Sequence, residues 1–425
     1  MIEIYDLIKK LYPICRSLTG NGNRETLNII KNIIPINIKE EPSGKNIYDW
    51  TVPKEWNIKD AYIKNKKGEK IINFKKHNLH IVNYSLPINK YISFKELKKN
   101  LYYLKDKPNW IPYITSYYKE TWGFCLSYND YIKMEEYGDD EEYQVFIDST
   151  LQNGSLTYAD LIIRGQTNKE ILISTYICHP SMCNDNLSGL CLTTYLAKYL
   201  LENKNYYTYR FIFVPETIGS IIYIHNNFDI LKKNVIGGYV ITHVGDQGEF
   251  TYLKTRNENT IIDKITIFIL DEMKQKYKIR NFLTCGSDER QYNFPGIDLN
   301  IGSIMKTKYT EFAEYHTSGD DLNFISKIAL EESLNIYKKC IFLIENNKKY
   351  KMNILCEPFL SKYNLISDIS GQSYTKHKNG YGIIKKLVYY LDGNNDIIDI
   401  SKKIDEKYID IIDNINLLIK NNIII

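Results

Sequence analysis

The sequence predicts an α/β fold with three layers, in which a mostly parallel sheet lies between helices. Between residues 156 and 347, short apolar runs typical of buried strands alternate with longer segments of helical periodicity. Two of the apolar runs are followed directly by His179 and by Glu216. Because such sheets place their active sites at the carboxyl ends of their strands, we expect these two side chains to share one site.

The elements of this core follow from the periodicity in chain order. At the start, Ile4, Leu7, Ile8 and Leu11 recur at helical spacing, and a second helix is expected through residues 27–33, after a polar turn at 20–23. Strands are expected at 161–163, 171–178, 211–214 and 239–241, and helices near 188–202, 220–231, 259–277 and 324–345. We therefore assign the α/β core to residues 1–55 and 153–350.

Residues 56–152 interrupt this pattern and are expected to form an inserted small β-rich domain. The stretch changes to short strands and loops, with one helix near 94–104. Its aromatic residues, Trp110, Tyr113, Tyr117, Tyr118, Trp122 and Phe124, are expected to fill the small domain's own core. The alternative is that they form the wall of a substrate cleft.

Residues 359–425 are expected to form a third, winged-helix-like domain. Helices are predicted at 380–391, 397–404 and 406–421, followed by a strand at 423–425. Residues 361–425 contain nine lysines, eight acidic residues and no arginine. DNA binding needs clustered cations, and base contacts most often use arginine, so we expect a packing, dimerisation or gating role and no nucleic-acid partner.

Composition agrees with a cytoplasmic enzyme of several domains. The net charge is only +4, from 55 basic and 51 acidic residues, so no polyanionic partner is implied. The first ten residues include two acids and lack the long apolar run of a signal peptide, and no apolar segment reaches membrane-spanning length. The eight cysteines show no disulfide pattern, which fits a reducing compartment. We expect no membrane partner.

Four side chains at the edges of predicted elements suggest a metal site. His179 and Asp185 lie on either side of one strand-to-helix corner, Glu216 ends the next strand, and His316 lies in a polar loop ahead of a helix. Two imidazoles and two carboxylates form a nitrogen and oxygen ligand set suited to Zn²⁺. A single histidine beside a strand is more often structural, so the prediction depends on the whole set.

Several segments, in this order along the chain, resemble those of the M28-type zinc aminopeptidases. They are 184–189 (Asn-Asp-Asn-Leu-Ser-Gly), Glu216 with 219–220 (Gly-Ser), 286–288 (Gly-Ser-Asp) and 315–320 (Tyr-His-Thr-Ser-Gly-Asp). The chain is more closely similar to a bacterial subfamily that carries an inserted small domain and a C-terminal winged helix. The segments typical of that subfamily are 16–20, 117–125, 177–181 and 215–220. The resemblance covers essentially the whole chain.

This resemblance implies that His179 is a metal ligand and that Asp185 is the carboxylate that bridges two zinc ions in dinuclear relatives. It implies that Glu216 and His316 complete the ligands of the other zinc. The chain departs from the family twice: Pro215 replaces one of two adjacent glutamates, and Thr242 or His243 stands where a ligand aspartate is expected. We therefore expect one zinc ion, with a second as the alternative, and His243 as a substitute ligand.

Three acidic residues are candidates for catalysis. Glu216 is the first candidate for the general base if it is not a ligand, and Glu289 is the second. Asp288 is expected to orient a ligand imidazole. For Glu289 and Arg290, a surface ion pair on a loop remains an equal alternative.

The resulting functional hypothesis is a zinc-dependent, aminopeptidase-like hydrolase of amide (peptide) bonds, in which metal-activated water attacks the carbonyl. The first alternative is an N-acyl amidohydrolase that acts on a small molecule such as an amino-sugar intermediate. The second is a non-catalytic scaffold or regulator with a degenerate metal site, because Pro215 and Thr242 replace family carboxylates. The expected partners are a small peptide or N-acyl substrate and, for a homo-oligomer, further copies of the chain.

Overall fold

Two compact units divide the chain, Met1–Lys338 and Lys339–Ile425. The computed structural model describes residues 2–274, 276–365 and 380–425. None of the helices in these ranges is both long enough and apolar enough to span a lipid bilayer. The two units are described in turn.

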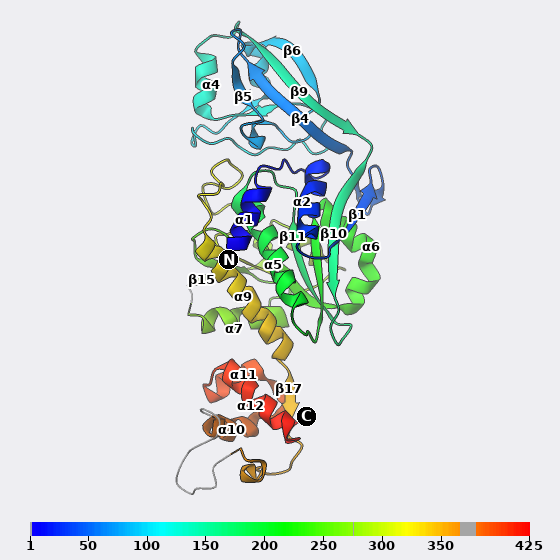
Figure 1. Cartoon of the computed structure of the whole chain (residues 1–425), viewed down its shortest axis with the longest axis vertical. Helices are drawn as coiled ribbons and strands as arrows, with labels where there is room; N and C mark the ends of the chain where they lie inside the picture. Colours follow the sequence, from blue (N-terminus) through cyan, green and yellow to red (C-terminus); the bar gives the residue numbers. More distant parts are fainter. Residues whose placement is uncertain (1, 275, 366–379) are drawn as a thin grey trace. The chain divides into compact units, whose positions relative to one another are not determined.

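An eight-stranded sheet forms the centre of the first unit (Figure 1). Its strands lie in the order β1 (Asn37–Pro42), β10 (Ser155–Ile163), β12 (Thr208–Val214), β11 (Glu170–Tyr176), β13 (Val235–Val240), β16 (Ile301–Met305), β14 (Phe250–Leu253) and β15 (Tyr277–Arg280). The four central strands β12, β11, β13 and β16 are parallel, whereas β1, β10 and β14 each pair antiparallel with a neighbour. The predicted mostly parallel α/β sheet is confirmed.

The helices of the sheet region are α1 (Ile2–Leu11), α2 (Asn21–Lys31), α5 (Gly189–Leu201), α6 (Ile218–Asn234), α7 (Ile261–Glu272), α8 (Glu289–Tyr292) and α9 (Lys327–Asn346). Helices α5 to α8 connect consecutive strands of the sheet, whereas α1 and α2 come before its first strand and α9 follows its last. The connection from β11 through α5 to β12 and the connection from β12 through α6 to β13 run in opposite directions across the sheet. Since parallel crossovers are right-handed, α5 and α6 cover opposite faces, which gives the three predicted layers.

Burial explains why the central strands appear as unbroken apolar runs in the sequence. All seven residues of β11 and all seven of β12 are buried, so neither face of these strands has a solvent-exposed row.

Helix α7 begins at a capping box in which the side chains of Thr260 and Asp263 each accept a hydrogen bond from the other residue's backbone N–H. The helix ends at Glu272, earlier than the predicted residue 277.

A separate antiparallel sheet is built from residues 55–152. Its strand order is β5 (Lys70–Asn73), β4 (Glu55–Lys64), β9 (Glu142–Gln152) and β6 (Ile88–Ser93). The remaining elements of this region are η1 (Asn78–His80), α3 (Phe94–Leu97), η2 (Lys98–Asn100), β7 (Leu101–Tyr102), β8 (Phe124–Cys125) and α4 (Tyr128–Glu135). The helix predicted at 94–104 is therefore shorter, because the chain becomes extended at residue 101 to pair with β8.

A short hairpin precedes this sheet and matters for the site described below. Strands β2 (Asn46–Ile47) and β3 (Trp50–Thr51) pair antiparallel, and the turn between them carries Tyr48 with a positive φ of 52°. Both Tyr48 and Trp50 are exposed.

The second unit contains the C-terminal winged helix. A two-stranded sheet pairs β17 (Lys349–Lys351) with β18 (Asp392–Asp396), and the helices are α10 (Gly380–Leu387), α11 (Ile397–Ile404) and α12 (Tyr408–Lys420), with the short turns η5 (Leu360–Tyr363) and η6 (Val388–Tyr390). Strand β17 lies before the predicted start at residue 359. The strand predicted at 423–425 is reduced to one bridge between Ile424 and Met352, and residues 366–379 of the predicted domain lie outside the described residues.

Candidate metal and active site

The carboxyl ends of three neighbouring strands supply most of the candidate site. His179 follows β11, Glu216 follows β12 and His243 follows β13. Asp185 lies in η3, the turn at Cys183–Ser188 that leads into α5, and His316 lies in the loop before α9. Both His243 and His316 have a positive φ, 51° and 53°.

His179, Asp185 and His316 form a cluster with the geometry of metal ligands. One ligand atom from each lies within 4.8 Å of the others. Asp185 Oδ2 is 3.0 Å from His316 Nε2 and 3.9 Å from His179 Nε2. Asp185 Oδ2 is buried and has no hydrogen-bond partner. Because a buried carboxylate oxygen without a donor is costly, this oxygen between two imidazoles fits a bound cation.

The protonation states also suit a metal. Burial lowers the pKa of His179 to about 4, so its imidazole is neutral at pH 7. Burial by itself raises the pKa of Asp185, but the imidazoles of His179, His243 and His316 more than offset this, and the pKa lies well below its usual value. Neutral imidazoles and an ionised carboxylate are the forms that bind zinc.

Asp320 and Arg16 hold the two ligand loops through the main chain. The carboxylate of Asp320 accepts hydrogen bonds from the backbone N–H groups of Asn184 and Asp185, at 2.6 and 2.8 Å. Arg16 is buried and its Nε donates to the carbonyl of His179 at 3.0 Å. Both residues belong to the motifs quoted above, but their partners lie more than 100 residues away, so no sequence pattern indicated these roles.

A chain of hydrogen bonds occupies the other side of Asp185. Tyr176 donates its hydroxyl proton to Asp185 Oδ1 and lies 2.8 Å from Thr242 Oγ1, which in turn is 2.6 Å from His243 Nδ1. His243 Nε2 lies 3.7 Å from Asp185 Oδ1 and is buried without a partner. The Thr242 hydroxyl is therefore engaged, and His243 points at Asp185 from the side opposite the cluster.

Glu216 lies beside the cluster without belonging to it. Its Oε2 is 3.9 Å from His179 Nε2, and its Oε1 accepts a hydrogen bond from Ser287 Oγ at 2.7 Å. Burial raises the pKa of Glu216 well above its usual value, and the charges of Asp288 and Asp185 add to this shift. A divalent cation bound nearby would lower the pKa of Glu216.

Asp288 supports the turn that carries Glu216. Its Oδ1 accepts hydrogen bonds from Thr217 N at 2.7 Å and from Ser220 Oγ at 2.9 Å. Burial raises the pKa of Asp288 to about 7. These hydrogen bonds go to the start of α6, and none links Asp288 to a candidate ligand imidazole among the described residues, so an orienting role for Asp288 stays a prediction.

Glu289 is buried, so the alternative of a surface ion pair is wrong. Its Oε1 accepts hydrogen bonds from the backbone N–H groups of Gly286 and Ser287 and, at 2.6 Å, from the hydroxyl of Tyr309. Glu289 does not line the cavity described next, which favours a structural role over that of a base. Arg290 is exposed and donates to Thr217 Oγ1 at 2.9 Å.

A cavity of about 300 Å³ opens beside the cluster. It is lined by Leu18, Trp50, Tyr113, Tyr117, Tyr118, Cys178, His179, Glu216, Thr217, Ile218 and Arg290. The backbone N–H of Tyr113 donates to the carbonyl of His316 at 2.8 Å, and its ring lies 5.3 Å from that of His179. The aromatic cluster predicted to fill the small domain's core is thus divided: Phe124 is in that core, whereas three tyrosines line the cavity.

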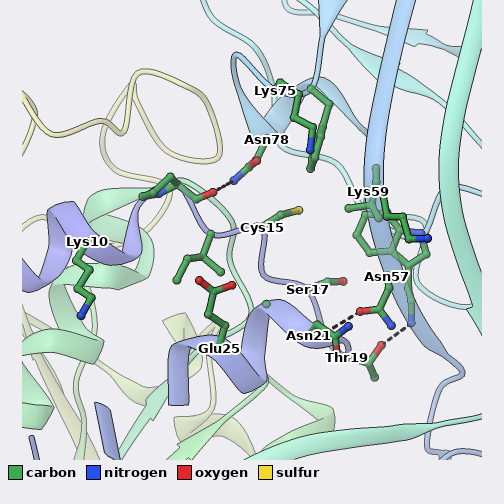
Figure 2. A pocket seen from close by; sticks show the side chains of 16 residues that line it. Lys10, Cys15, Ser17, Thr19, Asn21, Glu25, Asn57, Lys59, Lys75 and Asn78 are labelled. Atoms are coloured by element: carbon green, nitrogen blue, oxygen red, sulfur yellow. Dashed lines mark hydrogen bonds between the residues drawn. The ribbon is translucent and has the colours of Figure 1, made fainter. Parts of the chain in front are cut away.

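A second cavity, of about 540 Å³, lies on the other side of the segment 15–19 (Figure 2). Cys15, Ser17 and Thr19 line it, whereas Leu18 lines the cavity at the cluster. Figure 2 shows Asn78 at its edge, bonded to the carbonyl of Pro13. No residue of the cluster lines this second cavity, so the cavity beside Glu216 is the candidate for the substrate.

Fold and site together define a zinc-aminopeptidase-like α/β protein, and the predicted resemblance to M28-type enzymes is confirmed. A zinc aminopeptidase from Bacillus subtilis has the same core fold, with a TM-score of 0.57 and 12% identity over 81% of this chain and 94% of that one. The chain belongs to the family described as "Domain of unknown function (DUF4910)", whose model matches residues 5–347, and residues 348–425 match a winged helix-turn-helix model.

Two relatives from Clostridium acetobutylicum are similar over nearly the whole chain. One is described as "Putative polysaccharide biosynthesis protein with aminopeptidase-like domain" and is 48% identical over 406 residues, 94% of this chain and 91% of the relative. The other is a crystal structure of a "putative peptidase", with a TM-score of 0.91 and 44% identity, which covers 100% of this chain and 96% of that one.

Proposed function

We propose that this protein is a zinc-dependent hydrolase of amide bonds. The observation that carries the proposal is the convergence of two imidazoles on the buried, unpartnered Oδ2 of Asp185. The peptidase-like fold, which the chain shares with zinc aminopeptidases, supports a hydrolase.

His179, Asp185 and His316 would hold one Zn²⁺ ion. Two nitrogen donors and one carboxylate are a typical set for a catalytic zinc, which keeps one position open. When bound there, zinc supplies Lewis acidity that polarises an amide carbonyl and acidifies a water molecule. The closed chain of hydrogen bonds through Tyr176 and Thr242 leaves less room for a second ion, although His243 remains a candidate ligand for one.

Glu216 is proposed as the general base. Its carboxylate lies outside the three-residue cluster, yet its Oε2 is close to His179. Ser287 fixes Oε1, so Oε2 is the oxygen left to accept the proton of the attacking water and to return it to the leaving nitrogen. This arrangement needs only one glutamate, which accounts for Pro215 at the position where dinuclear relatives have a second.

A second candidate function, removal of an N-acyl group from a small molecule, uses the same chemistry. The relative whose description includes polysaccharide biosynthesis favours this substrate class over peptides. For the second unit we propose contacts with protein, including a second copy of the chain, because Asp410 and Asp413 on α12 disfavour a phosphate backbone.

The proposal is tested by assaying the purified protein against a panel of peptides and N-acyl compounds, with zinc and after treatment with a chelator. We expect turnover that needs zinc and that falls at least about 100-fold in Glu216→Gln. The matched control is Glu289→Gln, which we expect to retain zinc and most of its turnover. Bound zinc with no hydrolysis of any amide would instead favour the scaffold alternative.

A further inference from the structure

The charge of the cavity beside the metal cluster restricts its substrates. Among the residues that line it, Glu216 carries the only carboxylate and Arg290 is the only lysine or arginine. Trp50 and three tyrosines are four of the nine other residues that line it. A substrate with a positive charge would therefore meet a cation and aromatic rings, with a single carboxylate to balance it.

That carboxylate already has partners. Glu216 Oε1 accepts the Ser287 hydroxyl proton, and its Oε2, which faces His179, is the oxygen proposed to act as the base, so neither oxygen is left to pair with an ammonium group. A charged group removed from water without a counter-ion is strongly disfavoured. The free α-amino group of a peptide consequently lacks a binding partner in this cavity.

Arg290 is the cation of this cavity, and its charge acts on the nearby carboxyl groups of Glu216 and Asp288 without direct contact. Its guanidinium donates to the hydroxyl of Thr217, and among the described residues it forms no ion pair with a carboxylate. By contrast, Arg280, ten residues earlier, is paired with Glu311 at 2.9 Å. An unpaired guanidinium at the rim of a cavity offers a planar set of donors to a carboxylate or a phosphate.

Large aromatic side chains surround the same opening. Trp50, Tyr117 and Tyr118 are between 40% and 51% exposed although all three line the cavity. Tyr118 donates its hydroxyl proton to the carbonyl of Thr51 at 2.7 Å, which ties the tyrosine loop to the β2–β3 hairpin. These rings form a preformed surface on which a flat or ring-shaped group can pack.

We propose that the substrate is an N-acylated compound that carries an anionic group and a ring, and that Arg290 binds the anion. This inference rests on the hydrolase function proposed above. In the reaction, the oxygen of water bonds to the acyl carbon, the carbon–nitrogen bond breaks and a proton passes to the nitrogen. The products are a carboxylic acid and an amine whose anionic group is unchanged.

Binding to the zinc-loaded Glu216→Gln protein tests the proposal separately from turnover. The carboxylate probe is N-acetylphenylalanine and the phosphate probe is N-acetylglucosamine 6-phosphate; phenylalanine amide has a free amine and no anion. We expect at least one anionic probe to bind about tenfold or more tightly than phenylalanine amide in calorimetry. We also expect Arg290→Gln to lower the affinity for that probe about tenfold, and Arg290→Lys to bind it with an affinity between those of Arg290→Gln and the unchanged protein.

The control is Arg280→Gln, which removes an exposed arginine outside the cavity and should leave these affinities unchanged. Tighter binding of phenylalanine amide, affinities that do not change in Arg290→Gln, or no binding of either anionic probe would each overturn the proposal. Arg290-dependent binding without hydrolysis by the wild type would support this inference while contradicting the hydrolase function.

Discussion

Replacing Asp185 by asparagine should destabilise the metal-free protein and abolish the stabilisation by zinc. In the metal-free protein, the pKa of Asp185 lies well below its usual value, so the ionised carboxylate is favoured in the folded state and contributes to stability at pH 7.5. An asparagine at this position can still accept the Tyr176 hydroxyl proton, and its NH₂ group would replace Oδ2 at 3.0 Å from His316 Nε2. The variant therefore keeps the shape of the side chain but loses the charge and the oxygen that faces the two imidazoles.

We therefore expect Asp185→Asn to lower the free energy of unfolding of the chelator-treated protein by about 1.5–3 kcal/mol. Zinc at 100 times its dissociation constant should stabilise the wild type by about 2.7 kcal/mol and the variant by nearly nothing. Urea denaturation at pH 7.5 measures the free energy of unfolding of the wild type and of the variant, each with and without zinc.

The control is Asp246→Asn, because Asp246 is buried but accepts hydrogen bonds from Asn184 and Thr307. That change breaks satisfied bonds and should destabilise the protein by about 1–3 kcal/mol. Zinc should still stabilise Asp246→Asn. The reasoning would be refuted if metal-free Asp185→Asn were at least as stable as the wild type, or if it were still stabilised by zinc.

Three further changes test the account elsewhere. Burial lowers the pKa of His77 to about 4, so the unfolded chain binds the proton first, and stability should fall by up to about 3 kcal/mol between pH 6.5 and pH 4. In His77→Gln, the free energy of unfolding should no longer fall in this way between pH 6.5 and pH 4. If the variant showed the same pH dependence as the wild type, the assignment to His77 would be contradicted. Arg210→Met leaves the fully buried Glu170 without its ion-pair partner, so the free energy of unfolding measured in urea should fall by about 3–5 kcal/mol. A fall of less than about 1 kcal/mol would show that the pair is not buried in solution. Ser287→Ala removes the hydroxyl that orients Glu216, and kcat should fall about 10–100-fold with little change in KM or zinc content. A change in KM alone would instead indicate a contact with substrate.

Strands and helices at the centre of the fold could be predicted where burial requires a recognisable pattern of apolar residues. Strands β11 and β12 are buried on both faces, so they appear as continuous apolar runs between polar loops. Strand β16 was missed although it is buried, and so were β14 and β15, which lie beyond it at one end of the sheet. Strands β14 and β15 have only four residues each, and β15 alternates lysine and arginine with apolar residues and is only partly covered.

The residues of the candidate metal cluster could be selected from the sequence because each stands at the edge of a predicted element. His179 and Asp185 were placed by their corner between strand and helix, and His316 by its loop. Asp320 and Arg16 act on backbone atoms of distant segments, and no sequence pattern specifies such partners.

Neighbours in sequence proved hardest to assign. Asp288 and Glu289 are adjacent acids at the start of α8, yet their side chains point to different partners. One binds the amide of Thr217 and the other accepts from Tyr309. Likewise, Tyr113 lines the cavity whereas Phe124 lies in the core of the small sheet, and spacing alone does not separate these outcomes.

Metal content measured by elemental analysis tests the central claim most directly. The wild type, Asp185→Ala, His316→Ala and the exposed control His225→Ala would each be dialysed against zinc and then against metal-free buffer. The account predicts about one zinc ion per chain in the wild type and in His225→Ala, and none in the other two variants. A wild type without zinc, or an Asp185→Ala protein that keeps it, would contradict the account.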